Sequence, residues 1–282
     1  MTPTVAAPRA LTRRPRARRA RSRIAPRSMG RWRRALVLFL AAPLLLRLVI
    51  AGLVIVALWW AVNWMYQVAR KPTELFFPLS RTLSKTPAET WRQYGSLFRE
   101  HSTAVIAPDL LAALAQAEGA GNPVARTYWR WQASMNPLAL YQPASSAVGM
   151  YQITDGTLRE ARRYCIHDHR VVEDGAWHDV RSCWFNALYV RVLPSHAVEM
   201  TAALLDRQVA RTLARRGITR ASLRQQQDLA ALIHLCGAGA GEAFARRGFR
   251  FAPGQRCGDH DPRQYLAQVN ALRRQFVRLA AA

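Results

Sequence analysis

The chain has 282 residues and a formal net charge of +24, with 41 Lys or Arg against 17 Asp or Glu. This length suits one or two domains and excludes a chain of many domains. The charge is uneven, because residues 1–34 hold twelve arginines and the first acidic residue is Glu74. The 211 residues after Lys71 carry 26 basic and 17 acidic groups. Their net charge of about +9 is ordinary for a folded domain that acts on an anionic polymer or surface.

Residues 35–66 are strongly apolar and are divided only by Arg47. The stretch from Leu48 to Tyr66 has 19 uncharged residues, and at about 1.5 Å per residue it nearly matches the roughly 30 Å of hydrocarbon in a bilayer. Four aromatic residues gather near its end, as in the belts at membrane interfaces: Trp59, Trp60, Trp64 and Tyr66. The pattern predicts a single transmembrane segment over 35–66, with a possible break at Pro43.

The arginine-rich side of a membrane span stays in the cytoplasm. Residues 1–34 are therefore predicted to be a basic cytoplasmic tail, and everything after residue 66 to lie in the periplasm, on the outer side of the cytoplasmic (inner) membrane. A cleaved signal peptide is the alternative, but the apolar run is long and lacks a small-residue cleavage pattern. The basic tail adjoins the span, so its orientation and its attraction to anionic lipid explain the positive charge. No nucleic-acid partner is expected.

Beyond the span the pattern is almost wholly helical. Residues 67–104, with three prolines, are expected to be a linker. Apolar residues at helical spacing, with capping residues at the ends, then predict helices over 107–118, after Thr157, over about 195–216, from Thr219 or Ser222 to about Cys236, and from Asp261 onward. Residues 170–192 are irregular, with a short hairpin expected around 173–175. The predicted fold class is mainly α, with no main sheet.

The four cysteines all follow the apolar segment: Cys165, Cys183, Cys236 and Cys257. An even number fits two disulfides in an oxidising compartment. Pairing of nearest neighbours is one of three possible connectivities, and four buried thiols are the alternative. His167, His169 and His178 lie near three aspartates, but their spacing matches no strong metal site. No metal and no cofactor are expected.

Glu118 stands at the C-terminal end of an apolar predicted helix, followed by a glycine-rich break. The negative end of the helix dipole and partial burial would both favour its protonated form. A protonated carboxyl is what a general acid for a glycosidic oxygen needs. Taken alone, the position fits a solvated glutamate at a frayed helix end better than a catalytic acid.

Residues 136–157 read NPLALYQPASSAVGMYQITDGT. This stretch resembles the transglycosylase SLT domain, the soluble lytic transglycosylase branch of the lysozyme superfamily. In that family a helix ends in a catalytic Glu, and an Asn-Pro element, a Ser, a Gly-x-x-Gln-Ile turn and a Thr follow. The match lies at residues 136–137, at 146–153 and at Thr157. The resemblance covers roughly residues 105–250.

The resemblance implies a lysozyme-like helical domain over 105–282, with insertions near 124–133 and 165–193. It implies Glu118 as the catalytic residue and a substrate-binding set of Ser146, Gly149, Met150, Tyr151, Gln152 and His234. Gly149 would let backbone approach a sugar, Met150 and Tyr151 would form an apolar wall, and Gln152 would offer an amide donor and acceptor. The chain departs from the family in two places. Gly119 replaces a Ser, and His234, Leu235 and Cys236 stand where a Tyr-Asn pair is usual.

The implied activity is cleavage of the β-1,4 bond between N-acetylmuramic acid and N-acetylglucosamine in the glycan strands of peptidoglycan, without water and with closure of a 1,6-anhydro ring. One alternative is a hydrolytic muramidase, with Asp155, Asp174 or Asp179 as a second carboxylate. Another is a catalytically silent, membrane-anchored glycan-binding scaffold of an envelope-spanning secretion or pilus assembly.

Overall fold

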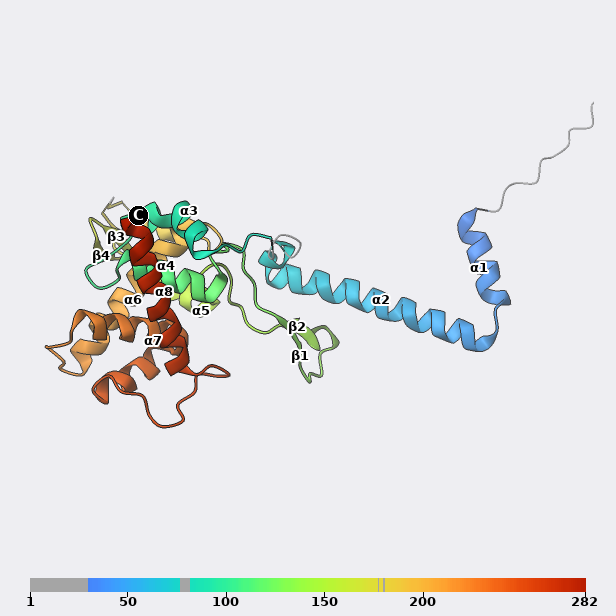
Figure 1. Ribbon diagram of the computed structural model, residues 1–282. Helices are drawn as coiled ribbons and strands as arrows, with labels where there is room; N and C mark the ends of the chain where they lie inside the picture. The colour runs from blue at the N-terminus through green and yellow to red at the C-terminus, as the bar shows by residue number, and fades with distance from the viewer. Residues whose placement is uncertain (1–29, 77–81, 177, 180) are drawn as a thin grey trace, which may run out of the picture. The chain divides into compact units, whose positions relative to one another are not determined.

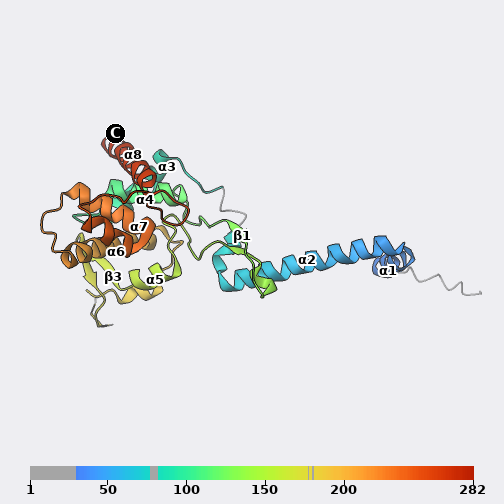
Figure 2. The same ribbon diagram turned by 90° about the horizontal axis from the view of Figure 1, so that it is seen from below.

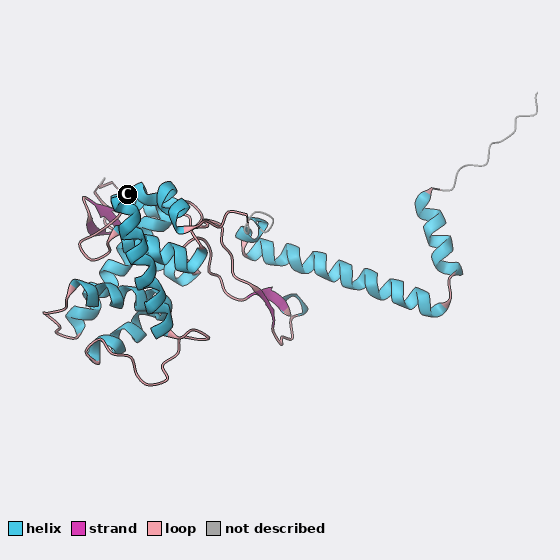
Figure 3. Cartoon of the chain, in the orientation of Figure 1, coloured by secondary structure: helices cyan, strands magenta, loops and turns pink. Residues whose placement is uncertain are grey.

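The computed structural model describes residues 30–76, 82–176, 178–179 and 181–282. Residues 1–29 of the predicted basic tail lie outside this part. The described chain is mainly helical, with eight α-helices, and its strands are confined to two short hairpins (Figures 1 and 3). The prediction of a mainly α protein without a main sheet is therefore confirmed.

The chain divides into two compact units, Met1–Leu58 and Trp59–Ala282. The first unit holds α1 (Arg31–Ala41) and the beginning of α2 (Leu44–Arg70). The two helices are separated at Pro43, where the break was predicted. Proline forces the residue before it out of the helical region, and Ala42 accordingly has an extended backbone, with φ −72° and ψ 153°.

Helix α2 contains the whole stretch from Leu48 to Tyr66 and carries exposed apolar side chains along most of its length. Among the helices of the described residues it is the one long and apolar enough to cross a membrane, judged by length and composition. An exposed apolar surface of this length is costly in water. It is the expected property of a membrane anchor or of a signal segment.

The second unit is a helical bundle built from α3 (Pro87–Glu100), α4 (Pro108–Gly119), α5 (Asp155–Ala161), α6 (Pro194–Arg215), α7 (Leu223–Arg246) and α8 (Pro262–Ala281). Helix α8 packs against α4 and α3, and α7 packs against α6. Figure 2 shows α8 and α3 at one edge of this bundle and α5 at the opposite edge. Helices α4, α6 and α8 begin close to where the sequence signals predict, each with Pro in its first turn. Helix α5 begins at Asp155, before Thr157 and not after it as expected.

Helix α3 corrects the expectation that residues 67–104 form a linker. It starts with a capping box between Thr86 and Glu89. Its Tyr94 and Phe98 are buried in the same core as Ile106 and Phe276. Part of the segment is therefore core, and a short 3-10 helix, η1 (Pro72–Phe76), precedes it.

Each predicted insertion takes part in a hairpin, although β2 of the first hairpin lies beyond the predicted bound at residue 133. In the first, β1 (Trp129–Trp131) pairs with β2 (Tyr141–Pro143), and the turn between them includes a short 3-10 helix, η2 (Pro137–Ala139). In the second, β3 (Tyr164–His167) pairs with β4 (Arg170–Glu173). The turn of this second hairpin lies at Asp168 and His169, both with positive φ, and not around 173–175 as expected. Aspartate and histidine are found at positive φ more often than most other residues.

All four cysteines form disulfides, Cys165–Cys183 and Cys236–Cys257. The prediction of two disulfides is confirmed, with the nearest-neighbour pairing. The first bond holds the β3–β4 insertion to the residues that precede α6. Disulfides persist in oxidising compartments, so both bonds indicate that this unit lies outside the cytoplasm.

Candidate functional site

Glu118 lies in the last turn of α4, as predicted. The helix ends at Gly119, and Ala120 closes it in the left-handed region with φ 48°. The Glu118 side chain is 18% exposed, so it is neither sealed in the core nor free in solvent. Its two carboxyl oxygens have different surroundings, which gives them different chemical possibilities.

One carboxyl oxygen of Glu118 is held by Tyr265, in the first turn of α8. The Tyr265 hydroxyl donates a hydrogen bond of 2.5 Å to Oε1 of Glu118. Burial, and then the charge and hydrogen bond of Glu118, raise the pKa of Tyr265 well above its usual value, so this hydroxyl stays a donor. Among the described residues, Oε2 of Glu118 accepts no hydrogen bond. That oxygen is the one able to exchange a proton with a ligand.

His234 is the second neighbour of Glu118. Its Nε2 lies 3.9 Å from Oε1 of Glu118, and its side chain is 11% exposed. Burial lowers the pKa of His234, against the opposing effects of Glu118 and of a hydrogen bond with the Tyr151 backbone. The imidazole is therefore neutral at neutral pH and adds no positive charge beside the carboxyl. The predicted role of His234 was a polar contact to substrate, and its place beside Glu118 was not expected.

The turn at residues 148–153 packs directly against the end of α4. It is closed by paired backbone hydrogen bonds between Val148 and Ile153. A Cβ on Gly119 would lie 2.8 Å from the Met150 Cα, so a side chain there, even serine, would force the turn away. Glycine at position 119 is thus explained by the close packing of two backbones.

Gly149 also serves packing within the protein. Its φ is +82°, and a Cβ there would meet the carbonyl oxygen of Arg191 at 2.6 Å. The close approach that the glycine permits is therefore to neighbouring backbone. The expectation that it is needed for approach to a sugar has no support here.

The structure corrects the roles predicted for Met150 and Tyr151. Their side chains are 0% and 1% exposed and belong to the core. The Tyr151 hydroxyl donates to the carbonyl of Leu111, 3.2 Å away. These two side chains pack beneath the turn and form no wall against a sugar. A run of apolar residues in a loop fits either role in sequence, and burial decided between them.

Gln152 faces a cavity and keeps one polar atom available. Its Nε2 donates to the carbonyls of Gly149 and Ala125, at 2.9 and 3.3 Å. Turning the amide round would place its oxygen against two carbonyls, so this orientation is fixed. Its Oε1 accepts no hydrogen bond from the described residues. Gln152 can therefore accept from a ligand, whereas the prediction gave it both roles.

The cavity has a volume of about 310 Å³ and lies between α5, α6 and α7. His234 and Gln152 both line it, as does Thr157 of the matched stretch. The other polar residues of the lining were missed from sequence: Thr154, Glu160, Thr201 and Gln208. Thr201 is 4% exposed, and its Oγ1 has no hydrogen-bond partner among the described residues. A buried hydroxyl of this kind is usually satisfied by water or ligand. Glu118 does not line the cavity itself but adjoins it through His234.

Ser146 lies apart from this group. Its Oγ accepts from the backbone of Asp155 at the start of α5. It lines a different cavity, of about 250 Å³, together with Arg191 and Lys71. Asp155 pairs with Arg191 at 2.8 Å, so this first candidate for a second catalytic carboxylate is engaged elsewhere. The structure brings together Glu118, Gln152 and His234, and it leaves Ser146 outside.

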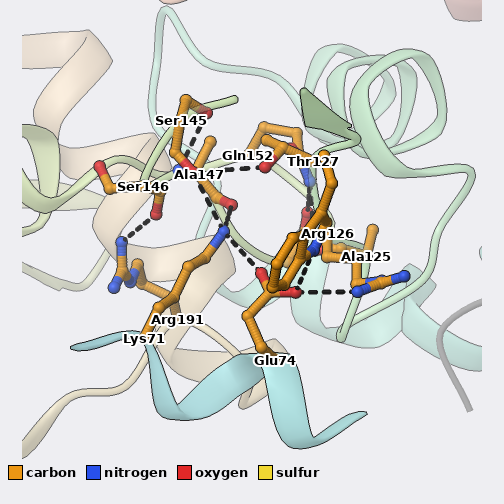
Figure 4. A network of polar contacts seen from close by, with 12 residues as sticks. Lys71, Glu74, Ala125, Arg126, Thr127, Ser145, Ser146, Ala147, Gln152 and Arg191 are labelled. Atoms are coloured by element: carbon orange, nitrogen blue, oxygen red, sulfur yellow. Dashed lines mark hydrogen bonds and ion pairs between the residues drawn. The ribbon is translucent and has the colours of Figure 1, made fainter. Parts of the chain in front are cut away.

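A buried ionic network supports the other side of the turn (Figure 4). Glu74 of η1 is fully buried and pairs with Lys71 at 3.2 Å and with Arg126 at 2.8 Å. Lys71 Nζ also donates to the carbonyls of Ser145 and Ala147, both at 3.1 Å. Burial is the main cause that lowers the pKa of Lys71, and Glu74 opposes it. The network links the residues directly after α2 to residues 145–147, which precede the turn at 148–153.

The Cys236–Cys257 disulfide lies next to the part of α7 that lines the cavity. Helix α7 is kinked at Gly237, with φ 79° and ψ 169°, three residues after His234. Cys257 lies eight residues before Tyr265. The disulfide thus joins the kink of α7 to the segment that leads into α8, and it restricts both neighbours of Glu118 at once.

Comparison with models of known protein families finds no match to this chain, and comparisons with curated proteins and with solved structures find none either.

Proposed function

We propose that this protein is a membrane-anchored lytic transglycosylase with a lysozyme-like helical domain, acting on the glycan strands of peptidoglycan. The observation that carries the proposal is the carboxyl of Glu118. It is half-buried at a helix end, held through Oε1 by Tyr265, and beside the neutral His234. The adjoining cavity is lined by hydroxyl and amide groups, which suit a ligand rich in hydroxyl and N-acetyl groups.

The proposed reaction uses one carboxyl twice. Glu118 donates its proton from Oε2 to the oxygen that leaves C1 of the muramyl residue. The resulting carboxylate then takes the proton of the C6 hydroxyl of the same residue, whose oxygen attacks C1 and closes the 1,6-anhydro ring. The nucleophile is part of the substrate, and well-oriented intramolecular groups reach effective molarities of about 10⁵ M or more. The carboxyl ends in its starting protonation state.

The proposed location is the inner membrane, with a cytoplasmic N-terminus and a periplasmic helical domain. Helix α2 is the proposed anchor. Twelve arginines precede it, and the positive-inside rule keeps them in the cytoplasm. Both disulfides follow it, as expected of a domain exported to an oxidising compartment.

The test is digestion of purified murein by the full-length protein in detergent, with products identified by mass. The wild type is expected to release 1,6-anhydro-muramyl ends. Glu118→Gln is expected to lower the rate by about 100-fold or more, the usual contribution of a positioned acid and base. Glu100→Gln is the matched control, because Glu100 also ends a helix but is exposed; it should act as the wild type. Full activity of Glu118→Gln would refute the proposal.

Hydrolysis is the second candidate, and one observation favours it. Glu160 lines the same cavity as His234, and a second carboxylate could activate water. This alternative predicts reducing muramyl ends and loss of activity in Glu160→Gln. The transglycosylase proposal predicts anhydro ends in both the wild type and Glu160→Gln. A protein that binds murein but yields neither product would be the silent scaffold.

A further inference from the structure

The turn between β1 and β2 exposes apolar side chains to an unusual degree. Residues 130–137 are all exposed, with Trp131 at 65% and Met135 at 102%, and Tyr128 just before them is 66% exposed. Exposed aromatic and methionine side chains gathered on one hairpin mark an interaction surface. No Asp or Glu occurs between Gly119 and Thr154, whereas Arg130 is exposed. The surface is therefore apolar with a positive charge, as an anionic lipid surface requires.

The hairpin lies beside the last turns of α2 (Figure 1) and contacts them through aromatic side chains. Trp59 stacks on Trp131, with ring centroids 5.9 Å apart and planes 9° from parallel. The Trp59 Nε1 donates to the carbonyl of Pro137 at 3.1 Å. Trp60 meets Tyr141 edge-on, with centroids 5.0 Å apart. The aromatic belt of the helix and the aromatic residues of the hairpin thus form one cluster.

Two polar residues of α2 show that this contact is specific. Asn63 and Gln67 are 0% and 3% exposed. The Asn63 amide donates to the carbonyl of Tyr141 at 2.8 Å, and the Gln67 amide to that of Leu138 at 2.7 Å. Such amides would be costly next to lipid without partners. The hairpin supplies a carbonyl to Nδ2 of Asn63 and to Nε2 of Gln67, and so it is held at one level, alongside Trp59 to Gln67. Oδ1 of Asn63 accepts no hydrogen bond from the described residues.

That level coincides with the outer boundary of a bilayer crossed by α2. Arg47 marks the inner boundary by the snorkelling of its charge. From Arg47 to Trp59 the helix rises about 18 Å, and from Trp59 to Gln67 about 12 Å more, at about 1.5 Å per residue. The hydrocarbon layer is about 30 Å thick. The stretch that holds the hairpin therefore lies in the outer part of the bilayer and its interface.

We propose that the β1–β2 hairpin is seated in the outer interface of the membrane, with Trp131 and Met135 turned toward lipid. The occupant of this surface is the bilayer that α2 crosses. The inference rests on the proposed anchoring by α2 and is independent of the chemistry at Glu118. The hairpin would give the protein a second point of contact with the membrane beside its transmembrane helix.

The test places a fluorophore on the hairpin of the full-length protein. All four native cysteines are in disulfides, so a cysteine introduced by Met135→Cys is the one thiol available for an environment-sensitive dye. The protein is reconstituted in vesicles of phosphatidylethanolamine and phosphatidylglycerol that contain a lipid spin-labelled near the top of its acyl chain. The dye is expected to lose most of its fluorescence to this lipid and to resist quenching by aqueous iodide.

Three further positions make the result decisive. Ala133→Cys repeats the measurement on the hairpin in case Met135→Cys does not fold. Leu223→Cys, exposed at the start of α7, should be quenched by iodide and not by lipid. Ile55→Cys, exposed on α2, reports whether the helix is inserted. Quenching at Ile55 with none at the hairpin overturns this inference alone. No quenching at Ile55 overturns the anchoring as well, whatever the murein digest yields.

Discussion

The two oxygens of the Glu118 carboxyl are expected to have different roles, one in orienting the group and one in proton transfer. Oε1 is fixed by the hydroxyl of Tyr265, so the orientation of the group is set before a ligand arrives. Oε2 has no partner among the described residues and can face a ligand. Tyr265 is distant from Glu118 in sequence, with a separation of 147 positions. It is nevertheless the residue on which the geometry of the candidate site depends most directly.

Replacing Tyr265 by Phe should therefore lower the rate of murein cleavage. A hydrogen bond to a charged group contributes about 1.5–3 kcal/mol, and it is strongest when Glu118 is a carboxylate, between its two proton transfers. The expected loss is about 10- to 100-fold, measured as product released per unit time. Tyr128→Phe, at an exposed tyrosine, is the control and should change nothing. An unchanged rate in Tyr265→Phe would show that the orientation of the carboxyl is set by other contacts.

His234 should make the fold sensitive to acid. Its pKa is lowered in the folded state by burial, whereas in the unfolded chain it is about 6.5. As pH falls through that unfolded value, the unfolded chain takes up a proton first, so stability is lost. The loss attributable to His234 is at most about 1.4 kcal/mol per pH unit and ends at the lower, folded pKa. Above pH 7 the group contributes no pH dependence.

The measurement compares urea unfolding of the wild type and His234→Gln at pH 7.5 and at about pH 5.5. The wild type should lose more stability on acidification than the variant. His178→Gln, at an exposed histidine, should behave as the wild type. An equal loss in the wild type and His234→Gln would mean that the imidazole is as easily protonated in the folded state as in the unfolded one.

Among the elements, η1 is distinguished by its one charged residue, which lies at the centre of a buried ionic network. Glu74 is fully buried between Lys71 and Arg126, and it also accepts from Nε1 of Trp129 at 2.9 Å. Removing one partner of a buried ion pair typically costs about 3–5 kcal/mol. Glu74→Gln should lower the free energy of unfolding by about 3 kcal/mol, the low end of that range, because Lys71 has a lowered pKa and can give up its charge.

Urea unfolding in detergent, followed by tryptophan fluorescence, measures this effect. The matched control is Glu173→Gln, whose side chain is 41% exposed and pairs with Arg163. Exposed pairs contribute about 0–1 kcal/mol. Equal effects of the two substitutions would indicate that the buried network contributes no more than a surface pair.

The elements show what sequence patterns can and cannot supply. The starts of α4, α6 and α8 were predictable because a proline lies in the first turn of each one, and α8 also has a capping side chain, that of Asp261. Helix α7 was expected to end near Cys236, and its first part does end there, at the Gly237 kink. Its continuation to Arg246 was missed, because glycines at 237, 239 and 241 read as a break. Helix α3 was missed as a core element because its apolar residues pack against α4 and α8. Those contacts join separate parts of the chain, and the local pattern of apolar residues does not indicate them.

The candidate site was only partly predictable for a related reason. Glu118, Gln152 and His234 have local signals, namely a helix end, a glycine-bearing turn and a departure from a motif. Tyr265 has none beyond its place on the inward side of α8, because helical periodicity indicates burial but not the partner. The same holds for Thr201 and Glu160, which reach the cavity from α6 and α5. Met150 and Tyr151 had a signal, but it was equally compatible with the core.

At the scale of the whole molecule, the charge and the cysteines divide the chain in the same way. Residues 1–34 carry positive charge without cysteine, and the residues after 66 carry all four cysteines and all the acidic groups. The two disulfides have similar loop lengths, with sequence separations of 18 and 21 residues. Loops of that length are stabilised by about 3 kcal/mol per bond. Their positions differ, since one supports the β3–β4 insertion and the other supports the neighbours of Glu118.

Removing each disulfide should therefore have similar effects on stability and different effects on activity. Cys165→Ser with Cys183→Ser, and Cys236→Ser with Cys257→Ser, should each lower the free energy of unfolding by about 2–4 kcal/mol. At a temperature where both variants are folded, the second pair should cleave murein more slowly, because His234 and Tyr265 lose their common restraint. Circular dichroism gives the folded fraction and product analysis gives the rate. Equal rates in the two variants would contradict the restraint.

The network around Glu74 has a further consequence for where the protein can work. Many anchored enzymes hang from a loose tether and sweep a volume whose radius grows with tether length. Here the residues that follow α2 are locked, through Lys71, to the carbonyls of Ser145 and Ala147, just before the turn beside Glu118. Under the proposed anchoring, this packed connection, and not the length of a free tether, links the domain to its membrane helix.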